Sequence, residues 1–75
     1  MIFSRGDIVI SYEPFWITLK NKGISTYVLR EKFNISSETL HRMKNNKAIT
    51  TTKLDDFCYI LNCEVEDIIK HIKEN

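Results

Sequence analysis

Apolar side chains recur at i, i+3, i+4 and i+7 in short stretches of this 75-residue chain, and this repeat constrains the fold most. Such spacing places apolar groups along one side of an α-helix. Three stretches carry the full pattern: Tyr12, Phe15, Trp16, Leu19; Leu54, Phe57, Cys58, Leu61; and Val65, Ile68, Ile69, Ile72. Two shorter stretches between them carry Val28 with Leu29 and Leu40 with Met43. The sequence therefore predicts an all-α domain of five short helices.

Residues that start or stop helices separate these stretches. Pro14 suits a first helical turn, where its missing N–H is not needed. Hydroxyl side chains can cap the later helices at their N-termini, namely Ser25, Ser36 or Ser37, and Thr50, Thr51 or Thr52. Residues that tolerate positive φ or break helices follow the apolar stretches: Gly23, Asn34, Asn45, Asn46 and Asn62. The third helix is expected at about residues 36–45.

The start of the chain has a different composition. Residues 7–11, Asp-Ile-Val-Ile-Ser, form a β-branched run that is typical of a short strand. No second strand is expected within the domain, so this segment either frays or pairs with another chain. We therefore divide the chain into an N-terminal extension at 1–11 and a helical domain at 12–75.

Length and composition limit the class of protein. Apolar residues make up 43% of the chain, enough for one small core, and we expect Leu54, Phe57, Leu61 and Ile69 to be among the most buried residues. No apolar run approaches the roughly 18 residues that cross a membrane. Arg5 and Asp7 interrupt the apolar start, so no signal peptide is expected. Two cysteines fit a reduced, cytoplasmic protein in which both belong to the core.

Charge is segregated although the net charge is only +1. Between residues 20 and 53, eight Lys and Arg side chains face only Glu31 and Glu38, which leaves a local charge of +6. Residues 54–75 carry −4. A basic middle segment is typical of a polyanion-binding face, although chance clustering on a solvated surface explains charge alone about equally well.

The stretch from Ser25 to Asn46 resembles a helix-turn-helix of the phage repressor and Cro class. The resemblance rests on Leu29 and Phe33 in the first helix, Ile35 in the turn, the Ser36-Ser37 start of the second helix, and inward Leu40 and Met43. Residues 49–69 look like the fourth and fifth helices of that family, so the resemblance spans about residues 12–72. Two positions depart from the pattern, because Asn34 stands where Gly is usual and Arg30 where a small residue is usual.

The resemblance implies a regulator of transcription that reads duplex DNA with the helix at 36–45. The outward face of that helix supplies the expected base contacts, which are Ser37, Glu38, His41 and Arg42. Contacts to the DNA backbone are expected from Thr26, Arg30, Lys44, Asn45 and Lys47. Such a protein acts by occupancy, as repressor or activator according to where its site lies. A protein-interaction module of the same fold, such as an antirepressor or antitoxin subunit, is the alternative.

Other chemistry has little support in the sequence. Cys58, Cys63, His41 and His71 match no zinc-ligand spacing, and no glycine-rich phosphate loop is present. We expect no enzyme activity, cofactor, metal or small-molecule ligand. We do expect a homodimer, because two recognition helices can read half-sites about 34 Å apart. Its surface is either the strand at residues 7–11 or the last helix, through Ile60, Ile68 or Ile72.

Overall fold

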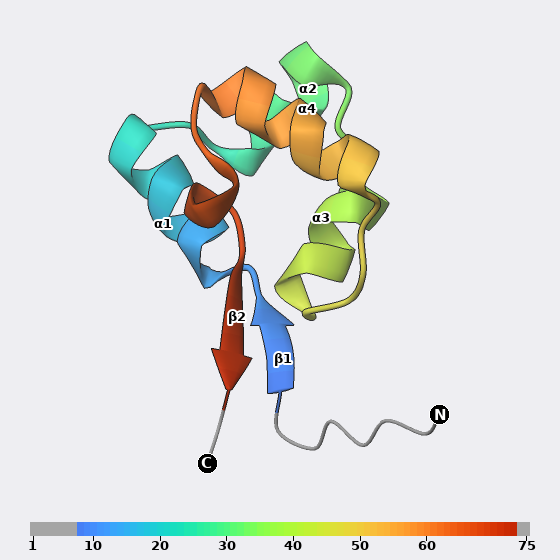
Figure 1. Cartoon of the computed structure of the whole chain (residues 1–75). Helices are drawn as coiled ribbons and strands as arrows, with labels where there is room; N and C mark the ends of the chain where they lie inside the picture. The colour runs from blue at the N-terminus through green and yellow to red at the C-terminus, as the bar shows by residue number, and fades with distance from the viewer. Residues whose placement is uncertain (1–7, 74–75) are drawn as a thin grey trace.

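The computed structural model describes residues 8–73. Four α-helices within this range are joined by short turns, and a pair of strands brings the two ends of the described chain together (Figure 1). In chain order the elements are β1 (Ile8–Ser11), α1 (Glu13–Lys22), α2 (Thr26–Phe33), α3 (Ser37–Lys44), α4 (Thr51–Leu61), the 3₁₀ turn η1 (Val65–Asp67) and β2 (Lys70–Lys73). No helix among these residues is long and apolar enough to cross a membrane.

The helix boundaries follow the local capping signals. Hydroxyl side chains accept backbone N–H groups at three N-termini, from Val28 at 3.2 Å, Thr39 at 3.1 Å and Lys53 at 3.2 Å; the capping residues are Ser25, Ser36 and Thr50. Three helices end on a residue with positive φ, and these residues are Gly23, Asn34 and Asn62. The predictions for α1, α2, α3 and α4 are therefore confirmed, with α3 beginning at Ser37.

The predicted fifth helix is wrong. The chain makes only the short turn η1 after α4 and then runs as strand β2, so the fold is mainly helical with a two-stranded sheet rather than all-α. Residues 68–72, Ile-Ile-Lys-His-Ile, contain three isoleucines, and a short segment with several β-branched residues suits a strand as well as a helix. Pairing with β1 decides between the two.

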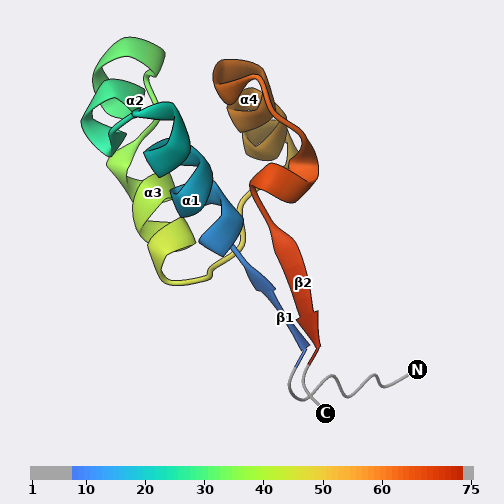
Figure 2. The same cartoon turned by 90° about the vertical axis from the view of Figure 1, so that its left-hand side faces the viewer.

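The expectation that β1 has no partner in its own chain is also wrong. β1 and β2 are antiparallel, with Ile8 opposite Lys73 and Ser11 opposite Lys70. This pairing gives both strands a hydrogen-bonding neighbour on one side. The two strands form a ribbon that projects from the helical part in both views (Figures 1 and 2).

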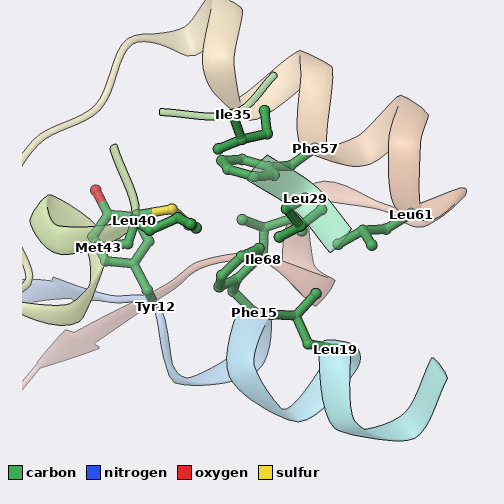
Figure 3. Close-up of a cluster of buried hydrophobic side chains, with 10 residues drawn as sticks. All are labelled: Tyr12, Phe15, Leu19, Leu29, Ile35, Leu40, Met43, Phe57, Leu61 and Ile68. Atoms are coloured by element: carbon green, nitrogen blue, oxygen red, sulfur yellow. The ribbon is translucent and has the colours of Figure 1, made fainter. Parts of the chain in front are cut away.

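One apolar core joins the helices and η1. In Figure 2 the first three helices lie on one side of the molecule and α4 on the other. Ten buried side chains fill the interior, contributed by every helix and, between the elements, by Tyr12, Ile35 and Ile68 (Figure 3). The rings of Phe15 and Phe57 meet edge to face, with centroids 5.0 Å apart. Phe57 and Leu61 are buried as predicted, whereas Leu54 and Ile69 are only half-buried at the base of the ribbon.

Candidate nucleic-acid interface

Helix α3 has one buried side and one polar side. Thr39, Leu40 and Met43 are buried, and Ser36 holds Thr39 with a hydroxyl–hydroxyl contact of 2.9 Å. Because the helix repeats every 3.6 residues, the remaining side chains share the outward face. This face consists of Ser37, Glu38, His41, Arg42 and Asn45, all of them exposed. Its side chains are hydrogen-bonding groups, as contacts to base edges require.

Two residues on this face form an ion pair. Nη2 of Arg42 lies 3.2 Å from Oε2 of Glu38, and the two side chains are 47% and 74% exposed. The pair follows from their i, i+4 spacing on one helix. An exposed pair of this kind contributes only about 0.3–0.5 kcal/mol, so both groups remain able to turn toward a ligand.

The C-terminal end of α3 is closed by a side chain that we expected to contact DNA. The Nδ2 atom of Asn45 donates to the backbone carbonyl of His41 at 2.9 Å and lies 3.3 Å from the ring Nε2 of His41. The backbone N–H of Asn45 donates to the same carbonyl at 3.1 Å, so main chain and side chain of Asn45 both close this helix end. The same side-chain amide thus contacts the imidazole on the outward face.

A hollow of about 660 Å³ lies where α1, α2 and α3 meet. It brings residues expected at the DNA backbone together with two expected at base edges, and its lining is Trp16, Thr26, Arg30, Ser37, Leu40, His41 and Lys44. Arg30 is exposed at this hollow, so its long side chain lies along the surface. For this reason α2 packs on α3 although the small residue that is usual in the family is replaced by Arg30.

Sequence reasoning missed Trp16 as part of this surface. The indole is half-buried, and the centroid of its ring lies 4.8 Å from that of Phe15. The side chain of Trp16 therefore lies at the edge of the core. The available signal was its place in a broad apolar stripe with Tyr12, Phe15 and Leu19 on α1. A stripe that wide leaves one member at the surface.

The loop after α3 is tied down from two sides. The backbone N–H of Lys47 donates to the carbonyl of Arg42 at 2.7 Å, and the hydroxyl of Tyr12 donates to the carbonyl of Lys47 at 2.7 Å. Burial raises the pKa of Tyr12, and a backbone hydrogen bond from Ile49 partly opposes that shift. The exposed Lys47 side chain is therefore carried on a fixed backbone beside α3. This anchoring role of Tyr12 was not predicted.

The structure gives no sign of a metal centre within residues 8–73. No three His, Cys, Asp or Glu side chains in this range lie close enough together to hold an ion. Cys58 and Cys63 are both unbridged and half-buried. The polar face of α3 and the hollow beside it are thus the functional surface that the geometry defines best.

Comparison with known proteins gives this surface a context. The family described as the Cro/C1-type HTH DNA-binding domain matches residues 15–74. The crystal structure of the transcriptional regulator VanUg, form II, is similar with a TM-score of 0.83 and 28% identity, over 99% of this chain and 96% of that chain. Among curated proteins none matches significantly. Since the family match spans most of the sequence and includes all of α2 and α3, the protein belongs to the Cro/C1-type helix-turn-helix DNA-binding family.

Proposed function

We propose that the protein is a sequence-specific regulator of transcription that reads the major groove of duplex DNA with α3. The observation that carries this proposal is the polar face of α3, exposed from Ser37 to Asn45. The major groove is about 12 Å wide, admits one α-helix and presents a distinct pattern of donors and acceptors for each base pair. A helix that exposes short and polar side chains along its length suits this groove.

Four side chains are assigned to base edges. Arg42 can donate two hydrogen bonds to guanine O6 and N7, and Glu38 can accept from cytosine N4. Their ion pair in the free protein places both groups on the same stretch of the helix, one turn apart. Ser37 and His41 border the hollow beside α2 and reach the bases on that side.

Contacts to the DNA backbone are assigned to cations and polar groups around this face. Thr26, Arg30 and Lys44 line the hollow beside α3, and Lys47 follows on the anchored loop. Asn45 is also assigned to a phosphate. Its amide either keeps or breaks its hydrogen bond to the carbonyl of His41 when DNA binds. The local charge of +6 between residues 20 and 53 supports an electrostatic component that positions the helix without reading sequence.

We further propose that the protein binds as a homodimer to two related half-sites. The eight residues of α3 span about 12 Å, so one copy contacts only a few base pairs. Two copies related by a two-fold axis double the contacts, and a bound dimer that overlaps a promoter represses transcription by occupancy.

Selection of bound duplexes from random DNA, followed by methylation interference, tests this function. We expect a consensus with two-fold symmetry, in which methylation of guanine N7 in the major groove blocks binding. Methylation of adenine N3, which lies in the minor groove, should matter less at the same half-sites. Interference confined to adenine N3 would contradict major-groove reading. No retention of any duplex at low salt would instead favour a protein-interaction module.

A further inference from the structure

The turn that ends α4 places two cysteines at its two ends. Asn62 adopts a left-handed conformation with φ 51° and ψ 57°. The N–H of Cys63 donates to the carbonyl of Cys58 at 3.0 Å, and the N–H of Asn62 donates to the carbonyl of Tyr59 at 3.3 Å. This pair of hydrogen bonds defines a Schellman motif, which brings the first and last residues of the turn next to each other and is often accompanied by a contact between their side chains. Here those two residues are Cys58 and Cys63.

We propose that Cys58 and Cys63 are a modification site: a dithiol that closes to an intramolecular disulfide when the folded protein meets a low-molecular-weight disulfide. The backbone hydrogen bond already holds the two residues together across the turn, so closure requires side-chain rotation rather than unfolding. Each thiol also alters the pKa of the other.

We assign Cys63 as the first of the two to react, because it lines a hollow at the surface. It lines a hollow of about 500 Å³ at the end of α1, together with Thr18, Lys22 and Asp67 among others. Both cysteines pack against the apolar core, but Cys58 is absent from the lining of that hollow. The external disulfide therefore meets Cys63, and Cys58 serves as the resolving thiol.

The reaction is two successive thiol–disulfide exchanges. The thiolate of Cys63 attacks one sulfur of the external disulfide, which forms a mixed disulfide and releases one small thiol. The thiolate of Cys58 then attacks the sulfur of Cys63, which forms the Cys58–Cys63 bond and releases the second small thiol. The protein loses two electrons and two protons, and the external disulfide is reduced to two thiols.

Both thiols are poorly ionised at neutral pH, which makes closure slow there. Burial is the largest cause that raises the pKa of each cysteine, and nearby carboxylates raise the pKa of both further. The side chain of Lys22 acts in the opposite direction on Cys63. Because only the thiolate attacks, the rate should rise as the pH is raised through the alkaline range. The charged groups that act on the pair are Lys22, Asp55, Glu64 and Asp67.

Closure fixes the connection between α4 and η1. The turn leads directly to Asp67, whose carbonyl accepts the hydroxyl of Thr18 at 2.8 Å, and to Ile68 in the core. A bridge across this short loop restricts the unfolded chain while the native turn keeps its hydrogen bonds. The bridged protein should therefore unfold at a higher temperature, by roughly 5–15 °C for a domain of this size.

Mass spectrometry and thermal unfolding test the proposal together. The full chain is incubated with oxidised glutathione at pH 8.5, then quenched with acid, alkylated and digested with trypsin. Both cysteines fall in one tryptic peptide, residues 54–70, because no Lys or Arg lies between Lys53 and Lys70. We expect this peptide to lose two hydrogen atoms and to carry no alkyl group or glutathione. The oxidised monomer should also show the raised Tm, and a reductant should reverse both changes.

Single-cysteine variants provide the matched controls. Cys58→Ser should accumulate a glutathione adduct on Cys63, whereas Cys63→Ser should react more slowly and neither variant should gain in Tm. Glutathione adducts on both cysteines of the wild-type chain, or disulfide-linked dimers without the bridged peptide, would overturn the proposal. A bridged monomer that melts at or below the temperature of the reduced protein would also overturn it.

Discussion

In the free protein, the outward residues of α3 differ in their side-chain hydrogen-bond and ion-pair partners. Glu38 and Arg42 hold each other across an exposed i, i+4 pair, and Asn45 holds the carbonyl of His41. Lys44 makes no ion pair within the described residues and borders the hollow between α2 and α3. A cation in this position suits a phosphate, which attracts it regardless of the local base sequence.

Replacement of Lys44 by alanine should weaken binding to every duplex by a similar factor. Loss of one phosphate contact should reduce the slope of log K against log salt by about 0.9. Fluorescence anisotropy on matched and scrambled duplexes at several salt concentrations measures both effects. Lys22→Ala is the control. Lys22 is the last residue of α1 and lines the hollow that contains Cys63, whereas Lys44 lines the hollow beside α3. A loss confined to one DNA sequence would contradict the phosphate assignment.

At the scale of elements, local signals account for what could be predicted. Caps such as Ser25 and Thr50 act within their own first turn, so the four helices and their ends follow from nearby residues. The path after α4 does not follow in this way, because it depends on pairing with β1 nearly the whole chain away. The polar face of α3 was predictable from helical period. The contributions of Tyr12 and Trp16 were not, because they depend on how α1 packs beside α3.

The central position of Phe57 on α4 leads to a stability prediction. Its side chain is fully buried and meets the ring of Phe15 edge to face. Phe57→Ala should lower the free energy of unfolding by about 3–5 kcal/mol, because it leaves a cavity in the core. Tyr59→Ala on the same helix is the control, since Tyr59 is 87% exposed and should change stability by less than about 0.5 kcal/mol. Equal losses in urea denaturation would contradict this packing.

Tyr12 links β1 and α1 to the loop after α3. Tyr12→Phe leaves the carbonyl of Lys47 without its hydroxyl partner and should cost about 1–3 kcal/mol at pH 7. The folded-state pKa of Tyr12 is raised, so its contribution is complete below pH about 10 and falls as the pH rises through the folded-state pKa. The difference in unfolding free energy between wild type and variant, taken from denaturation curves, should therefore be smaller at pH 10.5 than at pH 7. A difference that grows with pH would contradict the sign of this shift.

At the scale of the whole molecule, the ribbon of β1 and β2 is the surface that we favour for the homodimer. Each strand pairs on only one side, and Val9 and Ile10 on β1 are 43% and 39% exposed. An open apolar edge of this kind can accept a second copy. The other proposed surface involved a last helix that the chain does not form.

A single lysine should therefore separate the two copies. We expect the wild-type protein to sediment as a dimer at micromolar concentration and Val9→Lys to sediment as a monomer, because the charge blocks the strand edge. Ile17→Lys is the control, since Ile17 is an exposed apolar residue on α1, outside the ribbon. A Val9→Lys protein that remains dimeric would place the dimer surface elsewhere.

The ratio of affinities for the selected duplex and a scrambled one, measured for wild type and Arg42→Ala, tests most directly whether α3 reads bases. Wild type should prefer the selected duplex by about 10³-fold or more. Arg42→Ala should lose about 1–3 kcal/mol on that duplex, roughly 5- to 150-fold, and much less on the scrambled one. Arg30→Ala removes a proposed contact to the DNA backbone, so it should weaken binding to both duplexes alike and leave the ratio unchanged. An unchanged ratio for Arg42→Ala would contradict sequence reading by α3.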